Sequence, residues 1–350
     1  MQRRKFLATT GAASLAQAVG SGRLERAVRI LDGVTASGAV SASSLYVSHR
    51  GQVFRKAFGA ARSPDTVFLL ASITKPMTAA AVMTLVDKGE LSLHDPVRKF
   101  LPDFKGGQRG IVTIRHLLTH TSGLPDMLPE NEDLRRRHAP LSEFVKGTCV
   151  TPLLFQPGTQ VKYQSMGILL AATIAERITG KPFREFLRQT VFTPLRMAQS
   201  SLGLGGRKIE ETALCQVTGD VGWNWNSPYW RDLGAPWGGA HSTAAEVGRF
   251  LEYFLAPHSR LLRPQTAASM IVNQTSGLNE PRGIGFMVKP GSFGKSCSAN
   301  SFGHYGSTGT IAWADPKSQL VCVLLTTKPA SESRDSVLGP VSDAVAESAL

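Results

Sequence analysis

Residues 72–89 read SITKPMTAAAVMTLVDKG and place a serine and a lysine three positions apart at the start of an expected helix. Residues three apart on a helix share one face, with Cβ atoms about 5–6 Å apart, so the Lys75 amine can reach the Ser72 hydroxyl. Pro76 lacks an N–H and is tolerated only near a helix start, so the helix cannot begin much before Ser72. The helix dipole then favours negative charge on the Ser72 oxygen. The segment predicts a serine nucleophile activated by a lysine.

The same spacing occurs a second time. A chain of this composition is expected to contain about one S-x-x-K by chance. The second copy, Ser292-Phe293-Gly294-Lys295, lies in the glycine-rich stretch KPGSFGKSCSANSFGH, which has no helical apolar pattern. We therefore predict that Ser292 is a loop residue and that Ser72 is the reactive serine.

Length and composition indicate an ordinary globular protein. The chain has 350 residues, of which 42% are hydrophobic and 19% charged, and this length suits two domains. No run approaches the roughly 18 apolar residues of a membrane-spanning helix. The formal net charge is +13, which favours anionic polymers such as those of the cell wall or simply keeps the protein in solution. No basic stripe is interleaved with aromatic residues, so we expect no nucleic-acid partner.

The first twenty residues, MQRRKFLATTGAASLAQAVG, differ from the rest of the chain. Paired arginines, a mildly apolar run and the small-residue segment Ala16-Gln17-Ala18 predict a twin-arginine-type export signal over residues 1–18. A basic tail or an amphipathic first helix is the alternative. The signal predicts a periplasmic or extracellular location.

The four cysteines are far apart and too few to hold a fold of this size. Cys322 lies in LVCVLLTT, which is typical of a buried strand. The sequence contains no HExxH and no CxxC, so we expect no metal and no other cofactor.

Strand-forming ends enclose a helical middle. Residues 24–35 have helical apolar spacing, two β-rich runs around a Gly51-Gln52 turn predict a hairpin, and GIGFMV, GTIAWAD and QLVCVLLTT predict strands near the C-terminus. Residues 126–215 are mainly helical. The pattern predicts an α+β fold in which helices flank an antiparallel sheet, with residues 24–85 and 216–350 in the sheet domain and 86–215 in an inserted helical domain.

Tyr163 is the candidate proton carrier. It follows FQPGT and directly precedes a helical pattern, so it lies on a loop at an element boundary. Nearby cations would lower its pKa enough for it to act as a general base. A half-buried core tyrosine is the alternative, because the Y-x-S tripeptide also occurs elsewhere in the chain.

A second candidate segment, His304-Tyr305-Gly306-Ser307, precedes a convincing strand. Here His304 can donate towards a substrate oxygen, and Gly306 allows a close backbone approach. The backbone N–H groups of Ser307 and Ser72 would form an oxyanion hole. A strand-entry turn with a surface histidine is the alternative.

Five blocks of sequence together resemble the serine β-lactamase and penicillin-binding-protein-like superfamily. They are ASITKPMTAAAVMTLVDKGELSLHDPVRKFLPDF, TIRHLLTHTSGLP, FQPGTQVKYQSMGILLAATIAERITG, PWGGAHSTAAEVGRFL and FGHYGSTGTIAWADP, in the order of that superfamily and spread over about residues 70 to 325. The chain is most similar to the class C-like branch, which includes esterases, D-aminopeptidases and D,D-peptidases.

The resemblance implies a role for each matching residue. It implies that Ser72 is acylated, that Lys75 activates it, and that Tyr163 is the general base of a Y-x-N element. His304 and Gly306 take the first and third places of a K-T-G element, and Ser307 N–H completes the oxyanion hole. The implied fold, a sheet flanked by helices plus a helical domain, agrees with the layout above.

Two positions depart from the superfamily's pattern. Ser165 replaces the asparagine of Y-x-N. Its hydroxyl is shorter than an amide and cannot both donate and accept hydrogen bonds at the same reach. His304 replaces the lysine of K-T-G, so a fixed charge for a substrate carboxylate is lost, because histidine is mostly neutral at pH 7. Both changes count against efficient hydrolysis of β-lactams.

The sequence therefore predicts a serine hydrolase that forms an acyl-enzyme on Ser72 and acts on a small ester, a D-amino-acid amide or peptide, or a cell-wall fragment. The alternative is a non-hydrolytic, penicillin-binding-like sensor or scaffold. A tryptophan-rich segment, residues 223–237, either lines the pocket or forms a packed loop. Nothing in the sequence indicates an oligomeric state.

Overall fold

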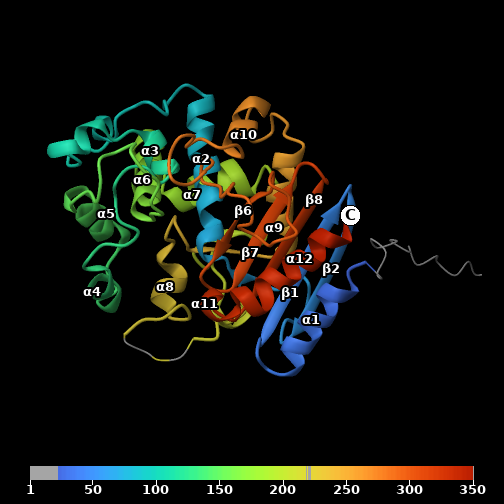
Figure 1. Ribbon diagram of the computed structural model, residues 1–350. Coiled ribbons are helices and arrows are strands. Elements are labelled where there is room, and N and C mark those ends of the chain that lie inside the picture. Colours follow the sequence, from blue (N-terminus) through green and yellow to red (C-terminus); the bar gives the residue numbers. More distant parts are fainter. Residues whose placement is uncertain (1–22, 218, 220–221, 350) are drawn as a thin grey trace, which may run out of the picture.

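The computed structural model describes residues 23–217, 219 and 222–349, and the predicted export signal lies outside these residues. Its main feature is a five-stranded antiparallel sheet in the order β2-β1-β8-β7-β6 (Figure 1). Strands from both ends of the chain meet in it, because β1 pairs with β2 on one side and with β8 on the other. The predicted antiparallel sheet is confirmed. The strands are β1 (Ala42–His49), β2 (Gln52–Gly59), β6 (Phe302–Gly306), β7 (Thr310–Asp315) and β8 (Leu320–Thr326).

The β1–β2 hairpin forms where the sequence predicts it. The register runs from Ala42 opposite Gly59 to His49 opposite Gln52, which leaves Arg50 and Gly51 as the turn, one residue earlier than the predicted Gly51-Gln52. Both turn residues have positive φ, 50° and 82°. Two left-handed residues match the right-handed twist of the flanking strands, so this short turn fixes the register.

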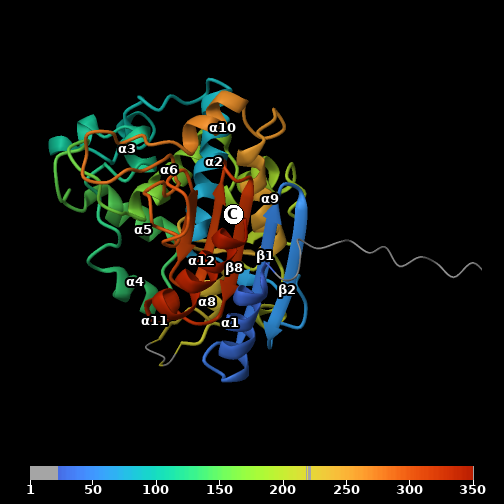
Figure 2. The ribbon, with the colours of Figure 1, turned by 45° about the vertical axis from the view of Figure 1, so that its right-hand side comes forward.

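Helices cover both faces of the sheet (Figures 1 and 2). On one face α1 (Glu25–Ala36) and α12 (Gly339–Ser348) pack over side chains that include Leu45, Trp313 and Leu324. On the other face α9 (Ala244–Leu255) packs against β1, β7 and β8. Successive strand residues point to opposite faces, so Leu324 belongs to the first core and Leu325 to the second.

The remaining helices lie mostly to one side of the sheet (Figure 1). The central one is α2 (Thr74–Asp87), which is buried along nearly its whole length. It contacts the helices α6, α7 and α10. The predicted domain boundaries near residues 86 and 215 stay a prediction. The other helices are α3 (Ile114–Leu118), α4 (Asn131–Arg136), α5 (Leu141–Val150), α6 (Met166–Thr179), α7 (Phe183–Leu187), α8 (Pro228–Leu233), α10 (Pro264–Met270) and α11 (Ala330–Ser333).

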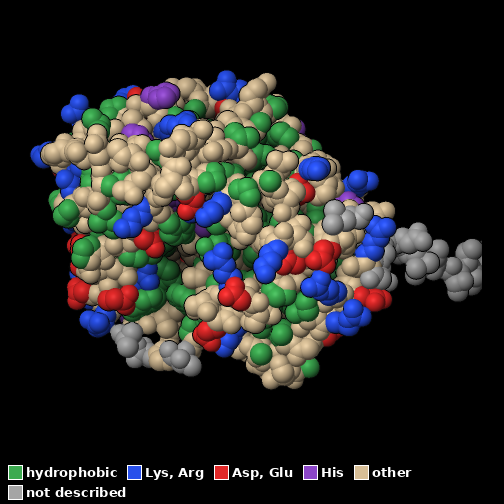
Figure 3. All heavy atoms as spheres, viewed as in Figure 1, with side chains coloured by type: hydrophobic (Ala, Val, Ile, Leu, Met, Phe, Trp, Pro, Cys, Tyr) green, Lys and Arg blue, Asp and Glu red, His purple; other side chains and the backbone are tan. Residues whose placement is uncertain are grey.

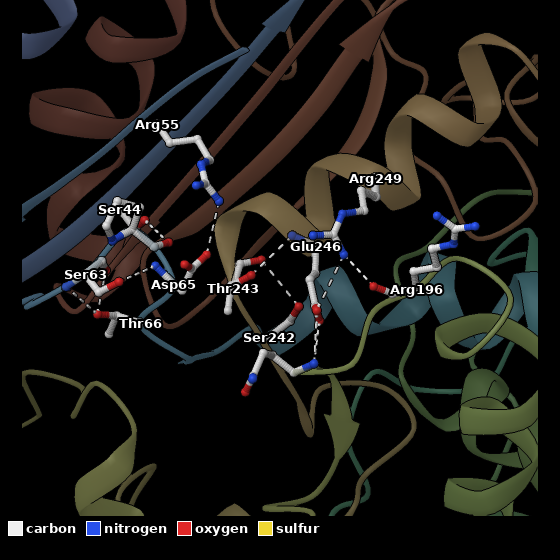
Figure 4. A network of polar contacts seen from close by, with 12 residues as sticks. Ser44, Arg55, Ser63, Asp65, Thr66, Arg196, Ser242, Thr243, Glu246 and Arg249 are labelled. Carbon is white, nitrogen blue, oxygen red and sulfur yellow. Dashed lines mark hydrogen bonds and ion pairs between the residues drawn. The ribbon is translucent and has the colours of Figure 1, made fainter. Parts of the chain in front are cut away.

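A small second sheet connects the helices to the main sheet. It consists of β3 (Phe68–Leu69), β5 (Ala240–Ser242) and β4 (Ser201–Leu202), in that order. The buried Glu246 of α9 fixes the position of this sheet, since both of its carboxylate oxygens accept the Gln199 N–H at 3.0 Å. Thr243 caps α9 by accepting the Glu246 N–H at 3.2 Å (Figure 4). These contacts hold β5 in place, and β5 pairs with β3, the strand that directly precedes the site described below.

Charges are mixed on the face seen in Figure 3, where Lys and Arg side chains are interspersed with Asp and Glu. Within the described residues, none of the helices has the length and apolar character needed to cross a bilayer.

Candidate active site

Ser72 lies in a 3₁₀ turn, Ala71–Ile73, that continues directly into α2. The helix begins at Thr74 and has Pro76 in its first turn, so the predicted helix start is confirmed. Ala71, the residue before the serine, has a φ of 48°. Left-handed backbone is costly for a residue with a Cβ and persists only where the surroundings enforce it.

The turn that carries Ser72 is fastened to the edge of the main sheet. Thr308 Oγ1 donates to the Leu69 carbonyl at 2.8 Å, and Thr310 Oγ1 donates to the Leu70 carbonyl at 2.9 Å. Gly306 allows this approach, because a Cβ at that position would lie 2.4 Å from the Leu70 carbonyl oxygen. The glycine is therefore required by the contact between β6 and the Ser72 turn.

Lys75 is completely buried and its amine lies beside the serine. Its Nζ is 3.0 Å from Ser72 Oγ and donates to the Trp237 carbonyl at 2.9 Å. Burial lowers the pKa of Lys75 from its usual 10.5 to about 7, partly opposed by the negative charge of Asp126. At neutral pH a large fraction of the amine is therefore uncharged and able to accept the Ser72 proton.

Tyr163 approaches Ser72 from the helical side and donates to Ser72 Oγ at 2.8 Å. The predicted lowering of its pKa is wrong. Burial raises the pKa of Tyr163 well above 10, and this outweighs the hydrogen bond to Ser72 and the nearby positive charge of Arg282. The phenol stays protonated at neutral pH, so of the two partners of Ser72, Lys75 is the one suited to be the base.

The loop that carries Tyr163 is held at its neighbour Gln164. Gln164 Oε1 accepts the Ser122 hydroxyl at 2.6 Å, and its backbone N–H donates to His120 Nδ1 at 3.3 Å. The ring of His120 lies 5.0 Å from that of Tyr163, centroid to centroid. Gln164 and His120 therefore hold the Tyr163 hydroxyl in position before substrate binds.

His304 is in the site, but as an acceptor rather than the expected donor. Its Nδ1 lies 2.7 Å from the Tyr305 carbonyl oxygen, which can only accept, so Nδ1 carries the hydrogen. Burial, with Lys75 and Arg282 nearby, holds the pKa of His304 well below its usual value. The ring is neutral, and Nε2, which has no partner among the described residues, presents a lone pair.

Ser165 is hydrogen-bonded to the carboxylate of Asp126, a residue that the sequence did not single out. Its hydroxyl donates to Asp126 Oδ1 at 2.6 Å and its backbone N–H to the Asp126 carbonyl at 3.2 Å. No hydrogen bond joins Ser165 to Lys75 in the described part of the chain. Asp126 directly follows the loop Thr121–Pro125, and only that position marked it in the sequence.

Ser307 borders the same cavity as Ser72, and its carbonyl accepts the Ala330 N–H at 2.9 Å. The pairing of its N–H with that of Ser72 as an oxyanion hole stays a prediction.

These residues border a cavity of about 690 Å³ between the sheet edge and the helices. Of the tryptophan-rich segment, Trp225, Trp230 and Trp237 line the cavity, whereas Trp223 packs behind Trp230, with ring centroids 5.4 Å apart. The segment therefore combines the two roles that the sequence left open. Sequence reasoning also missed several charged lining residues, namely Asp126, Glu132, Arg135, Arg282 and Arg334.

Fold and site together define a serine-lysine-tyrosine centre on a sheet flanked by helices. A model of the beta-lactamase family matches residues 27–346. The chain belongs to this family.

The chain is also similar to individual members. Esterase EstB of Burkholderia gladioli is 37% identical over 180 residues, which cover 45% of this chain and 46% of EstB. The structure of EstCE1, a hydrolase with promiscuous acyltransferase activity, matches with a TM-score of 0.78 at 21% identity, over 94% of this chain and 100% of that one. D-amino acid amidase of Ochrobactrum anthropi SV3 matches with a TM-score of 0.73 at 24% identity, over 93% and 97%.

These comparisons establish the family and the fold. The two structures are less than 25% identical to the chain and bear on its fold alone. The chain spans less than half the length of the first curated relatives it matches.

Proposed function

We propose that the protein is a serine hydrolase that works through an acyl-enzyme on Ser72. The observation that carries the proposal is the position of Ser72 Oγ, within hydrogen-bonding distance of both Lys75 Nζ and Tyr163 OH at the wall of an open cavity. A serine hydroxyl is a weak nucleophile until an adjacent base removes its proton.

In the acylation step, uncharged Lys75 takes the Ser72 proton while Oγ bonds to the substrate carbonyl carbon. Tyr163 donates to Oγ in the resting state, which directs the serine's own hydrogen towards Lys75. When the tetrahedral intermediate collapses, the bond to the leaving group breaks. The leaving oxygen or nitrogen receives the proton held by Lys75, directly or through the Tyr163 hydroxyl.

Deacylation reverses the proton movements. A water molecule occupies the place of the leaving group and gives a proton to the same amine. Its oxygen attacks the acyl carbon, the bond to Ser72 Oγ breaks, and the serine recovers its hydrogen. Because Lys75 must be uncharged in both steps, one ionisation with a pKa of about 7 controls both.

Esters and D-amino-acid amides or peptides are the proposed substrates, with little activity on β-lactams. The name of the matched esterase EstB supports esters in this range. His304 is neutral and cannot supply the fixed charge of a lysine at its position. The alternative is a non-hydrolytic, penicillin-binding-like sensor or scaffold. A scaffold has no need of a buried amine beside a serine, and catalytic turnover would exclude a sensor that is only acylated.

The test is intact mass spectrometry after incubation with p-nitrophenyl esters, D-alanine p-nitroanilide and nitrocefin, together with release of the chromophore. We expect turnover of esters or the anilide and a mass increase that Ser72→Ala abolishes. The absence of turnover and of Ser72-dependent labelling with every compound would refute the proposal. Rapid turnover of nitrocefin without turnover of short esters would reverse the substrate order.

We also propose that the protein is exported to the periplasm or beyond by the twin-arginine-type segment at residues 1–18. The paired Arg3 and Arg4 before an apolar run support this. Replacing both arginines by lysine should leave the full-length chain in the cytoplasmic fraction. Unchanged export of that variant would contradict the assignment.

A further inference from the structure

A second cavity lies in the helical part of the molecule, away from Ser72. It has a volume of about 680 Å³ and lies between α5, α6, the start of α7 and the end of α8. Both α5 and α6 are on the side of α2 that faces away from the main sheet (Figures 1 and 2). We call it the helical cavity, and its apolar lining includes Leu101, Leu141, Val145, Leu169, Ala172 and Phe183.

Two helices present apolar side chains to the interior of the helical cavity. The lining residues of α5 include Leu141, Val145 and Cys149, and those of α6 include Leu169 and Ala172. Residues three and four positions apart share one face of a helix, so each helix turns an apolar face towards the cavity. Ligand sites in proteins are mostly apolar cavities of roughly 300–1,000 Å³ that carry a few polar groups. The helical cavity has the size and the lining of such a site.

The mouth of the helical cavity is rich in positive charge. The charged residues that line the cavity are four cations and two acids, namely Lys105, Lys146, Arg177, Arg184, Asp103 and Glu176. All four cations are exposed, so they stand at the mouth rather than in the apolar interior. Lys105 and Arg177 form no ion pair among the described residues, and Arg177 donates to the Phe100 carbonyl at 3.1 Å. Two cations are therefore free to meet an anion at the mouth.

The other two cations have partners on the surface. Lys146 pairs with Glu143 at 2.8 Å, and Arg184 pairs with Asp232 at 3.5 Å. Exposed ion pairs of this kind are weak, because water screens them. Lys146 and Arg184 therefore add little to the binding of an anion, and Lys105 and Arg177 are the cations that matter.

The two acids of the lining do not oppose an anion strongly. Glu176 is half-buried and accepts the Phe183 N–H at 2.7 Å, and burial raises the pKa of its carboxyl group. A raised pKa makes the neutral form easier to reach beside a ligand. Asp103 is exposed at the mouth, where Lys105 and Arg177 outnumber it.

A short buried segment separates the helical cavity from the one that contains Ser72. Pro236 lines the helical cavity, Trp237 lines the other, and no described residue lines both. The segment is fastened to α2, since Thr78 Oγ1 donates to the Pro236 carbonyl at 2.6 Å and Lys75 Nζ to the Trp237 carbonyl at 2.9 Å. The ring of Trp237 also packs on Phe144 of α5, with centroids 5.8 Å apart. The two cavities are therefore distinct sites.

We propose that the helical cavity binds a fatty acid in its carboxylate form, with the alkyl chain between α5 and α6 and the head group at Lys105 and Arg177. Removing the chain from water favours binding, and a carboxylate accepts charge-assisted hydrogen bonds from both cations. An alkylammonium head group would be repelled at the same mouth, and an alcohol would lose the charge attraction. The proposal is independent of the hydrolase function, because neither Ser72 nor Lys75 takes part.

The first test measures chain and head-group preference by isothermal titration calorimetry with octanoate, octanol and octyltrimethylammonium. We expect octanoate to bind at least about tenfold more tightly than octyltrimethylammonium. Val145→Trp should weaken octanoate binding by about tenfold or more, because the half-buried Val145 lines the cavity and a larger side chain takes up its space. Val53→Trp, on β2, is the matched control and should bind octanoate as the unmodified protein does.

The second test addresses the head group. The double variant Lys105→Gln/Arg177→Gln should lower the affinity for octanoate by about fivefold and leave that for octanol within about twofold. Lys181→Gln is the control, since Lys181 is exposed, donates to Gln189 at 2.7 Å and does not line the cavity. The proposal would be overturned by equal binding of octanoate and octyltrimethylammonium, by the absence of octanoate binding, or by unchanged octanoate affinity in Val145→Trp. Ser72→Ala should bind octanoate normally, so a failure of the hydrolase function would be seen separately.

A measurement on the unmodified protein covers the case in which Val145→Trp does not fold, as judged by circular dichroism. An octanoate analogue with a diazirine in its chain is irradiated with the protein, and the labelled peptides are identified by mass spectrometry. We expect the label in residues 141–150 or 169–177, and excess octanoate should prevent it. A label confined to other segments, including those that line the cavity of Ser72, would overturn the proposal.

Discussion

The two S-x-x-K segments of this chain have the same spacing and opposite environments. Ser72 and Lys75 lie at the start of a buried helix, and their reactive atoms are 3.0 Å apart. Ser292 and Lys295 lie in an irregular segment, with Lys295 exposed, and border a separate cavity of about 390 Å³. The described residues include no hydrogen bond between them.

The difference shows that burial, rather than spacing, gives this motif its chemistry. A lysine in water keeps its proton at neutral pH and cannot act as a base. Burial lowers the pKa of Lys75 to about 7 and so makes the amine a proton acceptor. The sheet edge, the Tyr163 loop and the Trp237 carbonyl together create that environment for one copy of the motif.

Replacing each serine should give the largest contrast. We expect Ser72→Ala to lower kcat/KM for p-nitrophenyl butyrate by roughly 10⁴-fold or more, because the nucleophile is lost. Ser292→Ala should leave kcat/KM within about twofold, since Ser292 lies in a different cavity. Steady-state kinetics on both variants is the measurement, and comparable losses in the two would remove the distinction between the motifs.

Replacing the lysine of each motif should affect activity in one case only. Lys75→Met should lower kcat by about 10²- to 10⁴-fold, the usual contribution of a general base, whereas Lys295→Met should not.

Lys75→Met should also raise the free energy of unfolding below pH 7, by up to about 5 kcal/mol, since each unit of the pKa shift corresponds to about 1.4 kcal/mol. The pKa of Lys75 in the fold lies below that of an unfolded lysine, so its charged form destabilises the fold most below pH 7. This penalty fades as the pH rises towards 10.5, and the advantage of the variant should shrink with it. Urea unfolding at pH 6 and pH 9 tests this, and an equal or larger advantage at pH 9 would contradict the lowered pKa.

The contact between the sheet edge and the Ser72 turn can be disturbed with one methyl group. Gly306→Ala places a Cβ 2.4 Å from the Leu70 carbonyl oxygen, so β6 or the turn must move. We expect a loss of about 100-fold in kcat/KM, as for other displacements near 1 Å in a catalytic site. Gly33→Ala, in α1 with nothing within 4 Å of the added Cβ, is the matched control and should retain full activity.

Replacing Asp126 should have the smallest of these effects, a shift in the pH profile of kcat/KM. For the unmodified protein, kcat/KM should rise with pH through about 7, as Lys75 loses its proton. Asp126 opposes the lowering of the Lys75 pKa by burial, so Asp126→Asn should move this rise to lower pH, by about 0.5 to 1 unit. Asp343→Asn, near the second motif, is the control and should not move it. A shift to higher pH in Asp126→Asn would contradict the assignment of the titrating group to Lys75.

The sequence predicted much of the fold because its signals are local. Pro76 marked the start of α2, and the predicted Gly51-Gln52 turn between β-rich runs marked the hairpin to within one residue of the observed Arg50-Gly51 turn. The ordered blocks of sequence predicted which distant segments meet, and Ser72, Tyr163 and His304 do border one cavity.

The errors concern the environment of single groups. Neighbouring cations were expected to lower the pKa of Tyr163, but its burial, which the sequence does not reveal, dominates and raises it. His304 was expected to donate to the substrate, but its Nδ1–H donates to the Tyr305 carbonyl, which leaves Nε2 as an acceptor. Ser165 was compared with an asparagine, whereas its actual partner, Asp126, lies 39 positions away.

The secondary structure around Ser72, the family-like order of the segments and the pairing of Ser72 with Lys75 were readable from the sequence. Those properties depend on residues that are close in the chain or on the order of sequence blocks along the whole chain. The charge states of Lys75 and His304 follow from the tertiary structure, because both groups are buried there. A pKa depends on how far water is excluded from the group, and the packing of distant segments sets that exclusion.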